Sequence, residues 1–163
     1  DVDIQSIGYT QLAALTGNKV DSVVGFVNND VIRFQEADFP IRTLALDDPP
    51  LVSVGFGALD ATISGRRDDL AGMLRGVKRG AELCASDPEQ AVQIAAEYVP
   101  TLTEAAQQQH ALAVLKATTS LFGDEFGRQD SQRWEAMATF FASQGLLSQP
   151  VSATDAYTTD ITA

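Results

Sequence analysis

The chain has 163 residues, of which 45% are hydrophobic and 20% are charged, and this is enough for a globular fold with a sizeable core. Its 22 acidic and 11 basic residues give a formal net charge of −11, which argues against nucleic acid or an anionic membrane as a partner, because both attract clustered Lys and Arg. No apolar run is long enough for direct membrane insertion, and the single cysteine, Cys84, excludes an internal disulfide and a thiolate metal cluster.

The N-terminal part of the chain alternates predicted strands with short predicted helices. Alternating or β-branched apolar residues predict strands, and two periodic stretches, Thr10–Leu15 and Val31–Ala37, predict helices. A glycine, Gly17, is expected to end the first of these helices in a left-handed conformation. The predicted strands are Val2–Ile7, Val20–Phe26, Ile41–Leu46 and Leu51–Phe56.

From residue 58 onward the pattern changes to long helices. Apolar residues three and four apart predict a helix over Asp68–Ser86. Asp87 followed by Pro88 starts the next helix, which ends before Pro100. Two more predicted helices follow, one from Thr103 to Leu121 and one from Asp130 or Ser131 up to Gly145.

These elements predict an α/β fold, with a small parallel or mixed sheet followed by a helical run. Such a small sheet would leave edges and faces exposed. We therefore expect that its partner strands lie outside the chain or come from another copy.

The motifs of common enzyme classes do not occur in the sequence. There is no Walker loop, GxGxxG, GxSxG, HExxH or CxxC. The only histidine, His110, lies in a helical stretch without a nucleophile motif and is interpreted as a solvated helix residue. We therefore expect no catalytic residue, no metal and no cofactor in this chain.

One local cluster favours ligand binding. The predicted strand Val20–Phe26 ends in an aromatic residue and is followed by Asn28, Asn29 and Asp30. In open α/β sheets, ligands bind at the carboxyl ends of strands. Here the amides and the carboxylate would form hydrogen bonds to a polar heteroaromatic ring, and Phe26 would stack on it. The alternative is that the three polar residues only cap the following helix.

The segment Val20–Asp30, VDSVVGFVNND, resembles the VDAVVGYxNNE segment of the thiamine-pyrimidine-precursor-like family of solute-binding proteins. Six further stretches resemble segments of this family and occur in the same order along the chain. They are Gln11–Leu15, Asp87–Ala91, Tyr98–Pro100, Arg133–Trp134, Gly145–Val151 and Asp155–Asp160.

The resemblance implies the C-terminal half of a two-lobed, type 2 periplasmic-binding-protein fold. Residues 1–48 would be the end of the second lobe, 49–57 a hinge segment, and 58–163 a helical return to the first lobe. The implied function is that of a fragment of an ABC importer's substrate-binding protein, which is extracytoplasmic and binds a small heteroaromatic solute such as a thiamine pyrimidine precursor. Its implied partners are this small-molecule ligand and the membrane permease.

The resemblance also assigns residues to the ligand. Asn28, Asn29 and Asp30 fall on the family's Asn-Asn-Glu, whose acidic residue would bond the aminopyrimidine, and Phe26 stands where the pattern has tyrosine. Tyr9, after the first predicted strand, is a weaker candidate for the wall of the cleft.

Two alternatives remain open. One is a relic of the pyrimidine-synthesis enzyme of the same fold, although the stretch Asp48–Ser53 lacks the cysteines which that enzyme carries near its hinge. The other is a structural fragment without binding competence that forms a homodimer through an open sheet edge.

Overall fold

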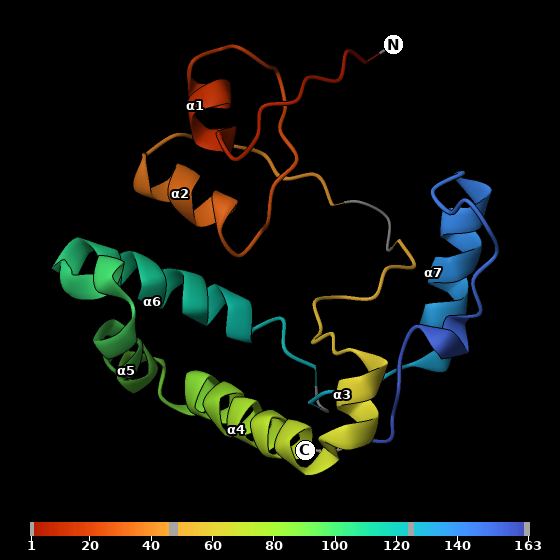
Figure 1. The fold of residues 1–163 in the computed structure, drawn as a ribbon. Coiled ribbons are helices and arrows are strands. Elements are labelled where there is room, and N and C mark those ends of the chain that lie inside the picture. The colour runs from red at the N-terminus through yellow and green to blue at the C-terminus, as the bar shows by residue number, and fades with distance from the viewer. Residues whose placement is uncertain (1, 46–48, 124–125, 162–163) are drawn as a thin grey trace. The chain divides into compact units, whose positions relative to one another are not determined.

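The computed structural model describes residues 2–45, 49–123 and 126–161. Within these ranges the chain forms helices joined by extended segments, turns and two short 3₁₀ helices (Figure 1). The helices are α1 (Gln11–Thr16), α2 (Asp30–Glu36), α3 (Asp60–Gly65), α4 (Arg67–Ser86), α5 (Pro88–Tyr98), η1 (Pro100–Thr103), α6 (Ala105–Thr119), α7 (Ser131–Ser143) and η2 (Ala153–Asp155). No helix among the described residues is long and apolar enough to cross a membrane.

The predicted α/β fold is wrong, because the described part of the chain contains no strand. The stretches predicted as strands are extended but unpaired, and Leu46, the end of one of them, lies outside the described residues. Several of their apolar residues are largely exposed: Ile4 is 91% exposed, Val24 86% and Val54 101%. A strand forms only when a neighbour accepts and donates its backbone hydrogen bonds, so apolar alternation alone does not make a sheet.

The helices, in contrast, follow the sequence pattern closely. The stretches predicted around Thr10–Leu15, Val31–Ala37, Asp68–Ser86 and Thr103–Leu121 are helical with small differences at their ends. Gly17 does not take the expected left-handed conformation, since its φ is −83°, and the positive φ of 52° is found at Asn18 instead. Asparagine tolerates this conformation because its short polar side chain bonds the local backbone.

Aspartates cap the starts of two predicted helices. The Asp87 carboxylate accepts a hydrogen bond from the Gln90 amide at 3.0 Å, with Pro88 at the first helical position of α5. Asp130 accepts from the Gln132 amide at 2.9 Å at the start of α7. Each carboxylate satisfies a backbone donor that has no partner within its helix, and this fixes where the helix begins.

The chain divides into two compact units. Residues 1–43 and 82–122 form the first unit, which contains α1, α2, α5, η1 and α6. Residues 44–81 and 123–163 form the second, which contains α3, α7 and η2. Helix α4 passes from the second unit to the first at Ala81–Glu82.

The core of the first unit is centred on α2, which packs against both α1 and α6. Phe34 of α2 is 2% exposed and is the largest fully buried side chain of the described residues. Its ring lies 5.9 Å from that of Phe39, which follows the helix. Ala14 of α1 and Val92 of α5 are also buried. Burial of Phe34 therefore fixes the rotation of α2 about its axis, and with it the direction of the polar side chains on the same helix.

In the second unit, α7 is joined to the segments before α3 and after α7. The Trp134 ring stacks on that of Tyr157 with 5.3 Å between centroids and 16° between planes. Arg133 donates to the backbone carbonyls of Leu51 and Pro49 at 2.8 and 3.2 Å. These contacts attach residues distant in sequence to the first turn of a single helix.

Candidate functional site

The predicted binding cluster forms the tight turn that begins α2. The carbonyl of Phe26 accepts the amides of Asn29 and Asp30 at 3.1 and 2.8 Å. The Asp30 carboxylate folds back and accepts the amide of Phe26 at 2.7 Å. One carboxylate oxygen of Asp30 is therefore engaged with the backbone in the turn.

Gly25 makes this turn possible because it leaves room for the carboxylate. A Cβ atom at position 25 would lie 2.8 Å from Oδ2 of Asp30 and 3.0 Å from its Cβ and Cγ. Real Cβ atoms do not approach other atoms so closely, so any larger residue would displace Asp30. The backbone conformation of this turn is therefore determined by residues within the turn itself, Gly25–Asp30.

The two asparagines of the cluster have different partners. The side-chain amide of Asn28 donates to the hydroxyl of Thr118 on α6 at 2.9 Å. The carbonyl oxygen of the Asn29 side chain accepts from Nε of Arg33 at 3.3 Å, one turn along α2. Asn29 itself makes no capping hydrogen bond through its side chain. Asn28 thus ties the turn to α6, whereas Asn29 orients a guanidinium.

The two aromatic residues predicted for the site are exposed. Residue Phe26 is 69% exposed and residue Tyr9 is 95% exposed. Both residues belong to the first unit. An exposed ring can stack on a flat ligand, because stacking would remove its apolar face from water.

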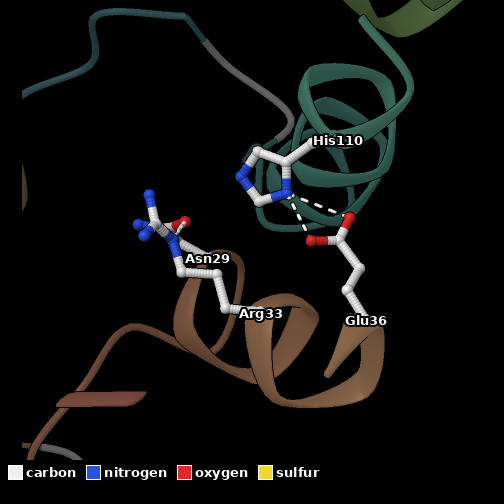
Figure 2. Close-up of polar contacts among 4 residues, drawn as sticks. All are labelled: Asn29, Arg33, Glu36 and His110. Carbon is white, nitrogen blue, oxygen red and sulfur yellow. Dashed lines mark hydrogen bonds and ion pairs between the residues drawn. The ribbon is translucent and has the colours of Figure 1, made fainter. Parts of the chain in front are cut away.

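The sequence does not reveal a hydrogen bond between two side chains at the other end of α2. Nδ1 of His110 on α6 lies 2.8 and 3.0 Å from the two carboxylate oxygens of Glu36, the last residue of α2 (Figure 2). The His110 side chain is 25% exposed and that of Glu36 is 46% exposed. His110 is therefore not the freely solvated helix residue that the sequence suggested, although it does lie in a helix.

The two side-chain contacts between α2 and α6 run in opposite directions along the chain. Asn28, just before α2, is hydrogen-bonded to Thr118, and Glu36 at the end of α2 is hydrogen-bonded to His110. Residue numbers therefore rise along the α2 segment while those of its partners fall along α6. The α2 segment therefore lies antiparallel to α6 and is attached near both of its ends. Nothing in the sequence pairs these residues, because they are separated by 90 and 74 positions.

A pocket of about 660 Å³ opens beside the contact between His110 and Glu36 within the first unit. Its volume lies in the range of small-molecule sites, roughly 300–1,000 Å³. Helices α1, α2 and α6 supply its walls, with residue Ala37 directly after α2. The lining residues are Leu12, Arg33, Glu36, Ala37, Ala106, Gln107, Gln109 and His110. Figure 2 shows that Arg33 and Glu36 project from α2, with Glu36 meeting His110 from α6.

A second charged contact joins α5 to α6 in the same unit. Nζ of Lys116 lies 2.7 Å from a carboxylate oxygen of Glu89, and this hydrogen bond lowers the pKa of Glu89 from its ordinary value. A smaller pocket of about 250 Å³ lies between the two helices and is lined by Glu89, Val92 and residues of α6. Among the residues that the structure describes, no group of His, Cys, Asp and Glu is arranged to hold a metal ion.

Comparison with known proteins gives two matches. The model of the family described as NMT1/THI5 like matches residues 1–91, which is more than half of the chain. The curated riboflavin-binding protein RibY of Chloroflexus aurantiacus is 26% identical over 169 aligned residues, covering 98% of this chain and 47% of RibY. The chain therefore spans about half the length of this curated relative. No solved structure gives a significant match.

Proposed function

The chain belongs to the NMT1/THI5-like family, and from this premise we propose that it is part of a solute-binding protein that captures a small heteroaromatic molecule for an ABC importer. The match over residues 1–91 carries this proposal, because it includes the whole predicted binding cluster. It also confirms the family resemblance inferred from the segment Val20–Asp30.

The ligand we place first is a flavin. RibY is named for binding riboflavin, and its alignment takes in 98% of this chain. A thiamine pyrimidine precursor, which the sequence resemblance suggested, is the alternative within the same heteroaromatic class. The name of this relative is that of a binding protein, which favours capture of a solute over catalysis.

The proposed contacts to the ring come from the start of α2 and from the exposed aromatic residues. Phe26 and Tyr9 offer ring faces that are largely in contact with water. Asp30 uses Oδ2 for the Phe26 amide, which leaves its second carboxylate oxygen to accept a ring N–H. Asn28 donates through its amide nitrogen to Thr118, and its carbonyl oxygen remains an acceptor for the ligand.

The partners and the location that we propose follow from the role of a solute-binding subunit in an importer. The subunit would work outside the cytoplasm and deliver its ligand to a membrane permease. Residues 49–57 are the proposed hinge between residues 1–48 and 58–163. A homodimer of the chain is a further proposal, and light scattering on the purified chain measures it directly.

The test is a titration of the purified chain with riboflavin. The signal is the quenching of flavin fluorescence when the ring stacks on an aromatic side chain. Asp30→Asn keeps an oxygen for the Phe26 amide but removes the charge, so riboflavin binding is expected to weaken by about 1.5–3 kcal/mol if the carboxylate accepts from the ligand. The matched control is Asp21→Asn, an exposed aspartate shortly before the cluster, which is expected to leave affinity unchanged.

Two results would count against the proposal. Absence of binding to riboflavin, together with absence of heat from an aminopyrimidine in calorimetry, would refute the ligand class for this chain. Equal affinity of the wild type and Asp30→Asn would instead favour a purely structural role for Asp30 in the turn that begins α2.

A further inference from the structure

The pocket between α1, α2 and α6 is lined by side chains that suit hydroxyl groups. Five of its lining residues are polar, and together they supply a guanidinium, a carboxylate, an imidazole and two primary amides. A hydroxyl group both donates and accepts hydrogen bonds, so it can find partners among these donors and acceptors. The remaining lining residues, Leu12, Ala37 and Ala106, are small or aliphatic and suit the carbon backbone of a polyol.

The same pocket is unsuited to a flat aromatic ring. None of its described lining residues is Phe, Tyr or Trp. The exposed rings of the proposed site, Phe26 and Tyr9, do not line it. A heteroaromatic ring on Phe26 would therefore lie outside the pocket, and only a substituent of that ring would enter it.

Helix α2 connects the two places. Asn29 and Asp30 stand at its start, Arg33 lies one turn later, and Glu36 is its last residue. At a rise of about 1.5 Å per residue, the distance from Asn29 to Glu36 along the axis is roughly 10 Å. The hydrogen bond between Asn29 and Arg33 connects the start of α2 to its middle and orients the guanidinium beside the cluster (Figure 2). An extended substituent that follows α2 would meet Arg33 first and Glu36 afterwards.

The charges of the pocket favour an uncharged substituent. Arg33 and Glu36 carry opposite charges one turn apart on α2, and the whole chain has a net charge of −11. A phosphate group would meet the Glu36 carboxylate and a repulsive long-range field. A hydroxyl group would meet neither penalty and would use the same donors and acceptors.

We propose that this pocket recognises the uncharged polyhydroxylated chain of a ligand whose heteroaromatic ring lies at the start of α2. This rests on the proposed function, and it specifies the substrate class: a ring with a neutral polyol substituent, bound through Arg33, Glu36, Gln107 and His110. Riboflavin has this composition, lumiflavin has the ring with a methyl group in place of the polyol, and flavin mononucleotide adds a phosphate to the polyol.

The first experiment compares riboflavin and lumiflavin by fluorescence titration of the full chain. Wild type is expected to prefer riboflavin by at least about tenfold, the equivalent of two ordinary hydrogen bonds. Gln107→Leu, which removes an amide that lines only this pocket, is expected to reduce the preference by about two- to tenfold. The matched control is Gln35→Leu, an exposed glutamine of α2 that does not line the pocket.

The second experiment adds flavin mononucleotide and tests the charge argument. Wild type is expected to bind it more weakly than riboflavin. Glu36→Gln keeps the shape of the side chain but removes the negative charge, so the disadvantage of the phosphate is expected to shrink by about two- to fivefold. Glu97→Gln, an exposed carboxylate of α5 outside both pockets, removes the same charge elsewhere and is expected to leave the ratio unchanged.

The outcomes separate this inference from the proposed function. Equal affinities for riboflavin and lumiflavin would overturn the polyol pocket while the solute-binding function stands. A preference for riboflavin that Gln107→Leu reduces no more than Gln35→Leu does would place the polyol elsewhere and overturn the pocket assignment. Tighter binding of flavin mononucleotide than of riboflavin would overturn the neutral chain. Failure of all three flavins to bind would refute the flavin assignment of the proposed function, and the inference with it.

Discussion

Nδ1 of His110 lies 2.8 Å from a carboxylate oxygen of Glu36, and this contact joins α6 to the end of α2. At the start of α2, Asn28 bonds Thr118 of the same partner helix. The segment from Asn28 to Glu36, which contains α2, is therefore held at both ends by side chains from a distant part of the sequence.

We expect a measurable coupling between Glu36 and His110. Their side chains are 46% and 25% exposed, so solvent screens the contact and its coupling energy is about 0.2–1 kcal/mol. A double-mutant cycle with Glu36→Ala and His110→Ala, followed by urea unfolding, measures it. A cycle that combines His110→Ala with Glu97→Ala serves as the control and should give no coupling. Additivity of the Glu36 and His110 variants would contradict the contact.

The hydrogen bond between Asn28 and Thr118 is expected to stabilise the first unit. Thr118→Val leaves the Asn28 amide without its acceptor and is expected to cost about 1 kcal/mol in unfolding free energy. Thr119→Val is the matched control, because the Thr118 and Thr119 hydroxyls both bond a backbone carbonyl of their own helix but only Thr118 bonds Asn28. Equal losses for the two valine variants in chemical denaturation would contradict a role for Asn28 in this attachment.

Gly25 is expected to tolerate no side chain. Gly25→Ala would place a Cβ atom 2.8 Å from Oδ2 of Asp30, so the turn must shift and the unfolding free energy should fall by about 1–3 kcal/mol. Gly57→Ala is the control, because a Cβ at position 57 meets nothing within 4 Å. Thermal unfolding compares the two variants. A loss no larger for Gly25→Ala than for Gly57→Ala would refute the close approach of Asp30.

The ion pair between Glu89 and Lys116 predicts an acid-sensitive contribution to stability. The hydrogen bond from Lys116 lowers the pKa of Glu89 in the folded chain. A carboxyl with a lowered folded pKa stabilises the fold above its unfolded pKa, and this contribution is lost as the pH falls through the folded pKa.

Lys116→Met removes the cause of that pKa shift. The difference in melting temperature between wild type and Lys116→Met is therefore expected to be present at neutral pH and to shrink as the solution is acidified below the ordinary pKa of a glutamate. Arg75→Met removes an exposed cation of α4 and provides the control for net charge. A wild-type advantage that stays constant from neutral to acidic pH would contradict the lowered pKa of Glu89.

The long helices were predicted from the sequence itself, whereas the short helix α3 (Asp60–Gly65) was not. Asp87 caps α5 where the sequence predicted its start, and Asp130 caps α7, whose start was predicted at Asp130 or Ser131. This is possible because a capping carboxylate accepts from backbone amides only two or three residues ahead. The cluster at the start of α2 is equally local, since Gly25, Phe26 and Asp30 form their turn within six positions. Short-range interactions of this kind need no knowledge of the rest of the fold.

The tertiary structure decided what pairs across long distances. The apolar alternation at Ile4 and Val24 predicted strands, yet a strand depends on a neighbour for its backbone hydrogen bonds, and the described residues provide none. His110 appeared solvated because its partner, Glu36, stands 74 positions away. The pocket between α1, α2 and α6 exists for the same reason, because burial of Phe34 and antiparallel packing of α2 on α6 bring its walls together.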